Sequence, residues 1–157
     1  MIKIGNRTSA VALFALAIGC ATASLVQADD VLVAFPTGYE SGVHYATVNR
    51  GGIREELFTS PEAIAAAENG QPMPSGTVVT MEDYRDGALY RYVVMEKRTG
   101  RGAHPAPDIR AGEWEFQWFN ADGTVRAGED LDRCHSCHRS QARQDFLFTT
   151  DRMKEAH

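Results

Sequence analysis

The sequence predicts an α+β domain whose central part is rich in β-strands. Residues 77–119 contain β-branched and aromatic runs without the 3.6-residue periodicity of an amphipathic helix. Two flanking segments, 60–70 and 129–146, have helical character instead. No internal repeat divides the chain, so we expect one domain with one core.

The first 28 residues predict a signal peptide rather than part of the fold. Lys3 and Arg7 form a basic region before an apolar run, 10–19, that is too short to span a bilayer. The segment VQA (26–28) then offers a signal-peptidase cleavage site before Asp29. We therefore expect a domain over 29–157, exported to a bacterial periplasm and free of the membrane after cleavage. A retained membrane anchor and lipid attachment at Cys20 are the alternatives.

Cleavage would leave 129 residues with 14 basic and 21 acidic side chains, a formal charge of −7. A chain of this length can bury one hydrophobic core. Since no basic run is present, we expect no nucleic-acid partner.

The predicted elements follow one another along the chain. An apolar run at 31–35 predicts a buried strand. Ser60 as N-cap, Pro61 at the first helical position and Gly70 as a stop predict a helix between them.

Three further strands are predicted, over 77–81, 88–97 and 113–119. On the last, the aromatic residues at 114, 116 and 118 share one face, with Glu115 and Gln117 on the other. A Gly- and Pro-rich loop, 99–112, joins the last two strands, and loops of this length are often functional.

Cys134, Cys137 and His138 form the pattern C-x-x-C-H, which is typical of covalent attachment of a c-type haem. Both thiols can add across the two vinyl groups of one porphyrin because a three-residue step on a helix places them on one side. The histidine that follows can then bind the iron. The pattern therefore predicts one covalently attached haem c, with His138 as the iron ligand.

Other uses of two cysteines fit less well. A zinc site normally needs four protein ligands, and no second paired cluster is present. A thioredoxin-like site would need a preceding strand and a βαβ context. A disulfide across so small a loop would constrain the unfolded chain weakly. We expect His135, inside the motif, to be a solvated position.

The position of the motif narrows the class of cytochrome. Small all-helical electron carriers have it near the N-terminus, with a methionine ligand far downstream, whereas here Met153 is the sole methionine among the 19 residues after His138. The cytochromes c′ have a C-terminal motif, but on a four-helix bundle, which does not fit the strand-rich region 77–119.

Several motifs in order resemble the cytochrome P-460 family, which includes the cytochrome c′-beta proteins. They are FPTGY (35–39), GTVVTME (76–82), YRYVVMEKRTG (90–100), GEWEFQWFNADG (112–123), CHSCH (134–138) and QDFLFT (144–149). The resemblance spans about residues 31–150. It implies a mainly antiparallel β-sheet with a few helices, a homodimer, and a haem whose distal face can be open. It also implies oxidation of hydroxylamine or binding of nitric oxide.

The hydroxylamine-oxidising members of this family have a lysine joined covalently to the haem edge, at a position that reads Met81 here. Lys97 lies on the next predicted strand and Lys154 in the C-terminal tail. The resemblance therefore implies a haem without the familiar cross-link, with Met81 as a cofactor-contacting residue.

Five side chains are candidates for the sixth coordination site: Met73, Met81, Met95, His44 and His104. For Met81, the competing interpretation is an ordinary core methionine. If no side chain binds the iron, Tyr90, Tyr92 and the tryptophans could form an apolar distal wall. Glu129, Asp130 and Asp132 could supply a distal acid or base, or could be a solvated first helical turn.

The sequence thus predicts an exported mono-haem cytochrome that binds a small ligand such as nitric oxide or carries out redox chemistry on nitrogen oxides. A hydroxylamine-oxidising enzyme is one alternative. A simple electron carrier with a periplasmic redox partner is another.

Overall fold

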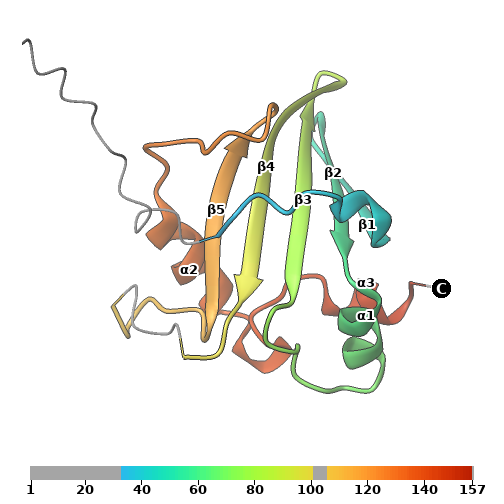
Figure 1. The fold of residues 1–157 in the computed structure, drawn as a ribbon, viewed down its shortest axis with the longest axis vertical. Helices are drawn as coiled ribbons and strands as arrows, with labels where there is room; N and C mark the ends of the chain where they lie inside the picture. Colours follow the sequence, from blue (N-terminus) through green and yellow to red (C-terminus); the bar gives the residue numbers. More distant parts are fainter. Residues whose placement is uncertain (1–32, 101–105, 157) are drawn as a thin grey trace, which may run out of the picture.

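The computed structural model describes residues 33–100 and 106–156, which form a five-stranded antiparallel sheet with a few helices (Figure 1). The strands lie in the order β1-β2-β3-β4-β5, so each strand pairs with its neighbours in the sequence. The predicted α+β class is confirmed. The predicted signal peptide, 1–28, lies outside the described residues and stays a prediction.

The first two strands, β1 (Val43–Arg50) and β2 (Ile53–Thr59), were not expected from the sequence. They form a hairpin whose turn is Gly51–Gly52, with φ values of +51° and +84°. A two-residue turn with positive φ at both positions matches the right-handed twist of the flanking strands, and glycine adopts it without steric cost. This Gly-Gly pair was the available signal for the hairpin.

The three predicted central strands are confirmed as β3 (Val78–Arg85), β4 (Ala88–Lys97) and β5 (Trp114–Asn120). In the register, Met95 lies opposite both Val79 and Phe116. The predicted alternation of β5 also holds, although Glu115 and Gln117 on its second face are buried as well. Both faces of the sheet are therefore covered at β5.

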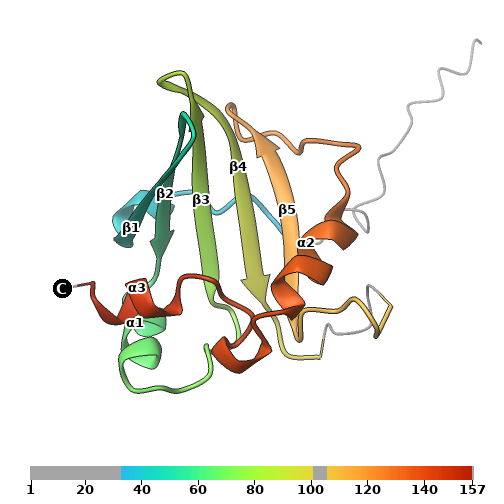
Figure 2. The same cartoon turned by 180° about the vertical axis from the view of Figure 1, so that it is seen from behind.

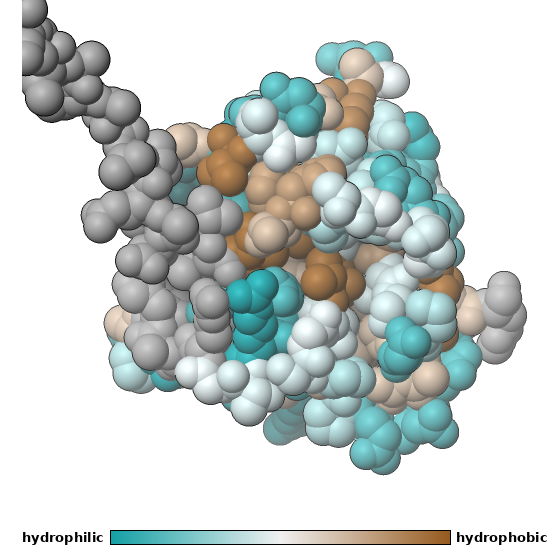
Figure 3. All heavy atoms as spheres, viewed as in Figure 1, coloured by the Kyte–Doolittle hydropathy of each residue, from teal (hydrophilic) through white to brown (hydrophobic). Residues whose placement is uncertain are grey.

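The predicted strand over 31–35 is wrong for its described part, residues 33–35, which have no strand pairing. Residues 33–35 are apolar because this segment crosses and covers one face of the sheet (Figure 1). Val33 is buried with Val94 and Phe119. The ring of Phe35 lies edge-on to Phe119, with the centroids 5.2 Å apart. Figure 3 shows this face, where hydrophobic atoms in the middle are bordered by hydrophilic ones.

The predicted first helix is confirmed as α1 (Pro61–Glu68), with the side chain of Ser60 accepting a hydrogen bond from the amide of Ala63. The predicted helical segment 129–146 is helical in α2 (Leu131–Arg139) and in a short 3₁₀ turn, Ala142–Gln144. A last short helix, α3 (Thr150–Lys154), follows.

The helices gather on the face of the sheet opposite the N-terminal segment (Figure 2). α2 packs against β5, and α3 packs against α1 and β1. The chain between α2 and α3 crosses the end of the sheet and encloses the main core, in which Trp114, Phe116 and Leu147 are buried. Within the described residues, no helix is long and apolar enough to cross a membrane.

Replacing Phe119 by alanine should lower the free energy of unfolding by about 3–5 kcal/mol, because it removes a fully buried ring that Val33 and Phe35 pack against. The measurement is urea denaturation followed by circular dichroism. Val125→Ala, at a position 40% exposed nearby, is the control and should cost less than about 1 kcal/mol. Equal losses in the two variants would contradict the assigned packing.

Candidate functional site

A cavity of about 490 Å³ lies between the sheet and the C-terminal segment. Most of its lining residues are apolar, and its polar groups come from two regions that are distant in the sequence. The apolar lining residues are Val48, Leu57, Val79, Met81, Val93, Met95, Phe116, Leu147 and Phe148, and the polar ones are Arg50, Glu55, His138, Thr149 and Arg152.

The strand register explains why the sheet wall of this cavity is apolar. Side chains that are paired across antiparallel strands share a face. One row of paired residues is Leu57, Met81, Val93 and Trp118, and the next includes Val79, Met95 and Phe116. Apart from Trp118, which does not line the cavity, these two rows form its hydrophobic floor.

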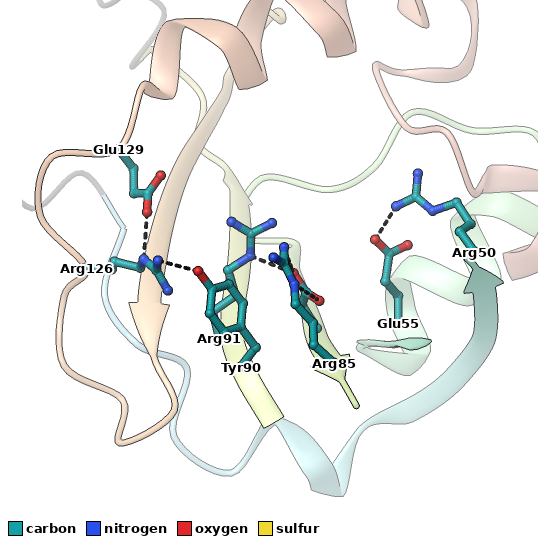
Figure 4. A network of polar contacts seen from close by, with 8 residues as sticks. Arg50, Glu55, Arg85, Tyr90, Arg91, Arg126 and Glu129 are labelled. Carbon is teal, nitrogen blue, oxygen red and sulfur yellow. Dashed lines mark hydrogen bonds and ion pairs between the residues drawn. The ribbon is translucent and has the colours of Figure 1, made fainter. Parts of the chain in front are cut away.

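A charged row borders this floor on the side of the β3–β4 turn. Glu55, Asp83 and Arg91 are paired in register and lie on the same face as Met81. Asp83 is 1% exposed and accepts hydrogen bonds from Arg85 and Arg91. Such a buried carboxylate is stable only when paired. Figure 4 shows this network, which continues through Tyr90 and Arg126 to Glu129; the Arg50–Glu55 pair lies apart from it.

α2 brings His138 to the wall of the cavity, whereas Cys134 and Cys137 of the same helix are not among the lining residues. The helix begins after Asp130, whose side chain accepts a hydrogen bond from the amide of Arg133 and caps the helix. Cys134 is partly buried against the core and Cys137 is exposed, and both thiols are free. Burial raises the pKa of the Cys134 thiol.

His138 is the one polar lining residue of the cavity that α2 contributes. Its Nδ1 donates a hydrogen bond of 2.7 Å to the main-chain carbonyl of Phe146. Its ring lies between Phe116 and Phe148, with centroid distances of 4.8 Å and 5.0 Å. Burial lowers the pKa of His138, so the imidazole is neutral at neutral pH, the form that binds metals.

The arrangement fits a haem. Histidine ligands of metals characteristically donate their second ring N–H to a carbonyl or carboxylate, which fixes the tautomer and the ring orientation. Here the Phe146 carbonyl takes that role, and Nε2 has no hydrogen-bond partner among the described residues. The apolar cavity beside His138 and the two free thiols on the same helix suit the porphyrin and its vinyl groups.

The structure separates the five candidates for the sixth ligand. Met81 and Met95 line the cavity together with His138. Met73 is buried in the core outside the cavity lining, and His44 pairs with Glu56 on the opposite face of the sheet. His104 lies outside the described residues.

The predicted aromatic distal wall is not observed. Tyr92 packs against Phe35 and Tyr39 on the opposite face, and Tyr90 belongs to the charged network. Trp114 is buried in the core, and neither tryptophan lines the cavity. The aromatic residues that line the cavity are Phe116 and Phe148, which flank the ring of His138.

The three predicted distal carboxylates also lie away from the cavity. Glu129 pairs with Arg126, Asp130 caps α2, and Asp132 is in the exposed first turn of that helix. The carboxylate that lines the cavity is Glu55, which the sequence analysis missed because β2 was not recognised.

The expectation that His135 is solvated is wrong, since this residue is 2% exposed. Its Nε2 lies 3.6 Å from the carboxylate of Glu115, and its ring packs edge-on against Phe116. Because α2 lies against β5, the position between the two cysteines turns inwards and anchors the helix to the strand.

The two lysines in the described residues are both in ion pairs. Lys97 contacts Asp145, and Lys154 contacts Asp151. Neither lysine lines the cavity that contains His138, whereas Met81 does.

Comparison with protein-family models matches residues 36–149 to the family described as Cytochrome P460. A search of curated proteins gives no match. The matched range contains all five strands, α2 and the loop that carries Phe146. Because this family model covers most of the chain, the protein belongs to the cytochrome P460 family and is a haem-binding cytochrome.

Proposed function

We propose that the protein is an exported cytochrome that holds one haem covalently through Cys134 and Cys137, with His138 as the axial ligand. We further propose that it binds a small nitrogen-oxide ligand such as nitric oxide. The observation that carries the proposal is the carbonyl-bonded His138 beside a largely apolar cavity. The periplasm, a periplasmic redox partner and a homodimer belong to the same proposal.

Attachment needs no oxidant. Each thiol adds its sulfur to one carbon of a vinyl group and its hydrogen to the other, so a thioether forms and a double bond is lost. Cys134 and Cys137 are three residues apart on α2, and His138 follows directly on the same helix. One porphyrin can therefore be held by all three side chains.

The other cavity residues would complete the site. Arg50 and Arg152, which pair with Glu55 and Glu155, line it and are the cations available to the haem carboxylates. Met81, Leu57 and Val93 would contact the porphyrin from the sheet and exclude water. Bound iron supplies one-electron chemistry and a place for a diatomic ligand.

One observation favours ligand binding over hydroxylamine oxidation. Both lysines in the described residues are paired with carboxylates away from the cavity, which argues against a lysine cross-link in this part of the chain. The carboxylates predicted as proton carriers also lie elsewhere, but Glu55 lines the cavity, so the presence of a carboxylate does not separate the two reactions. Electron transfer without ligand binding would require a strong sixth ligand, for which Met81 and Met95 are the candidates in the described cavity.

Replacing Cys137 by serine should remove one of two thioether bonds. The unreacted vinyl group would shift the alkaline pyridine spectrum to longer wavelength, and Cys134→Ser/Cys137→Ser should abolish covalent haem in the intact mass. Ser136→Ala, at an exposed position inside the motif, is the control and should leave the spectrum and mass of the holoprotein unchanged. A single-cysteine variant that retains two thioethers would exclude the assignment.

The ferrous protein should change its optical spectrum promptly when carbon monoxide or nitric oxide is added, because most side chains on the sheet side of the cavity are apolar and cannot bind iron. Met81→Leu, which keeps the apolar volume, should alter the association rate by less than about tenfold. A wild-type spectrum indifferent to both gases, with a Met81→Leu spectrum that responds, would instead identify Met81 as a strong sixth ligand and favour electron transfer.

A further inference from the structure

The carbonyl that accepts the hydrogen bond from His138 belongs to a backbone segment with a disfavoured conformation. Asp145 and Phe146 have φ values of +52° and +63°, in the left-handed region that residues with a side chain rarely adopt. Two such residues in succession persist only where the surroundings hold them in place. The Phe146 carbonyl therefore points at His138 because other contacts fix this turn.

Three hydrogen bonds hold Asp145. Its Oδ2 accepts one from Nζ of Lys97 at 2.6 Å and one from the amide of Met73 at 2.7 Å. Its main-chain carbonyl accepts a third from the indole Nε1 of Trp114, at 2.8 Å. The side chains of Lys97 and Asp145 are only 11% and 20% exposed, so this charged pair is partly shielded from water.

The ring of Phe146 is fixed by a different contact. Gly112 has a φ of +57°, and a Cβ atom added there would lie 2.4 Å from Cε2 of Phe146. The absence of a side chain at 112 thus leaves the space that the ring fills. Both neighbouring left-handed residues are held against the end of the sheet, one by polar contacts and one by packing.

We infer that Lys97 is a positioning residue for the axial histidine, acting through Asp145 and the carbonyl of Phe146 on Nδ1 of His138. The inference rests on the proposed function, since it concerns the ligand strength of His138 in the haem protein. A well-aligned acceptor at Nδ1 increases the basicity of Nε2 and so stabilises ferric iron relative to ferrous iron.

Loss of this alignment can be told apart from loss of a nearby charge, because the two effects have opposite signs. Removing a positive charge stabilises the ferric state by simple electrostatics and lowers the reduction potential. Weakening the hydrogen bond at Nδ1 makes His138 a poorer donor to ferric iron and raises the potential. Lys97→Met does both, and we expect the ligand effect to dominate.

The experiment measures the reduction potential of the haem protein in four forms: wild type, Lys97→Met, Lys97→Arg and Lys154→Met. Lys97→Met should shift the potential to a more positive value. Lys97→Arg, which keeps a cation opposite Asp145, should stay close to wild type. Lys154→Met removes the same charge from an exposed pair with Asp151 and is the matched control, with no positive shift expected. Circular dichroism checks the fold of each variant.

A negative or absent shift in folded Lys97→Met would overturn the inference and leave a purely structural ion pair. If Lys97→Met fails to fold, Lys97→Gln replaces it, because glutamine can keep one hydrogen bond to Asp145. This variant should give a smaller positive shift, and a negative or absent shift would overturn the inference in the same way. If the wild-type protein holds no haem on His138, the proposed function itself fails, and this is seen in the wild-type spectrum before any variant is compared.

Discussion

The site depends on one constraint, which is that the C-terminal segment must be tied to the end of a sheet formed by earlier residues. The cavity is the space between these two parts of the chain, and neither part encloses it alone. The contacts of Asp145 with Lys97, Met73 and Trp114 make this connection at one end. At the other end, the hydroxyl of Tyr45 on β1 bonds to Thr149 at 2.9 Å. Because both ends are fixed, the C-terminal segment holds His138 and Phe148 opposite the sheet, on the other side of the cavity.

The sheet face divides into zones because register places paired residues in rows. The middle rows are hydrophobic and form the cavity floor, and the Glu55–Asp83–Arg91 row limits that floor on one side. The cost of burying Asp83 is offset by two arginines. Arg91 also stacks over the ring of Trp118, at 3.8 Å from the centroid. Charge is therefore kept at the border of the pocket, where it stabilises the sheet and leaves the floor apolar.

Local signals in the sequence were enough for β3, β4, β5 and α1. Alternation, capping residues and fixed spacing act over a few residues, so one segment can be interpreted without the others. The β1–β2 hairpin was missed because Glu55 and Glu56 make β2 look like a surface segment, although both are buried in ion pairs. His135 was misjudged because its burial depends on contacts with Glu115 and Phe116, which lie on a strand distant in the sequence. The pairing of Lys97 with Asp145 spans 48 positions, a separation that no local pattern encodes.

The order of the strands also bears on how the molecule folds. A meander pairs each strand with the next one along the chain, so the sheet assembles through short loop closures. The contacts that close the cavity are far longer in sequence, 72 positions for Met73 to Asp145 and 104 for Tyr45 to Thr149. Closing such long loops costs more entropy, and this cost falls once the strands of the sheet are already paired. We therefore expect the pocket to close after the sheet has formed, while Cys137 is exposed even in the closed structure.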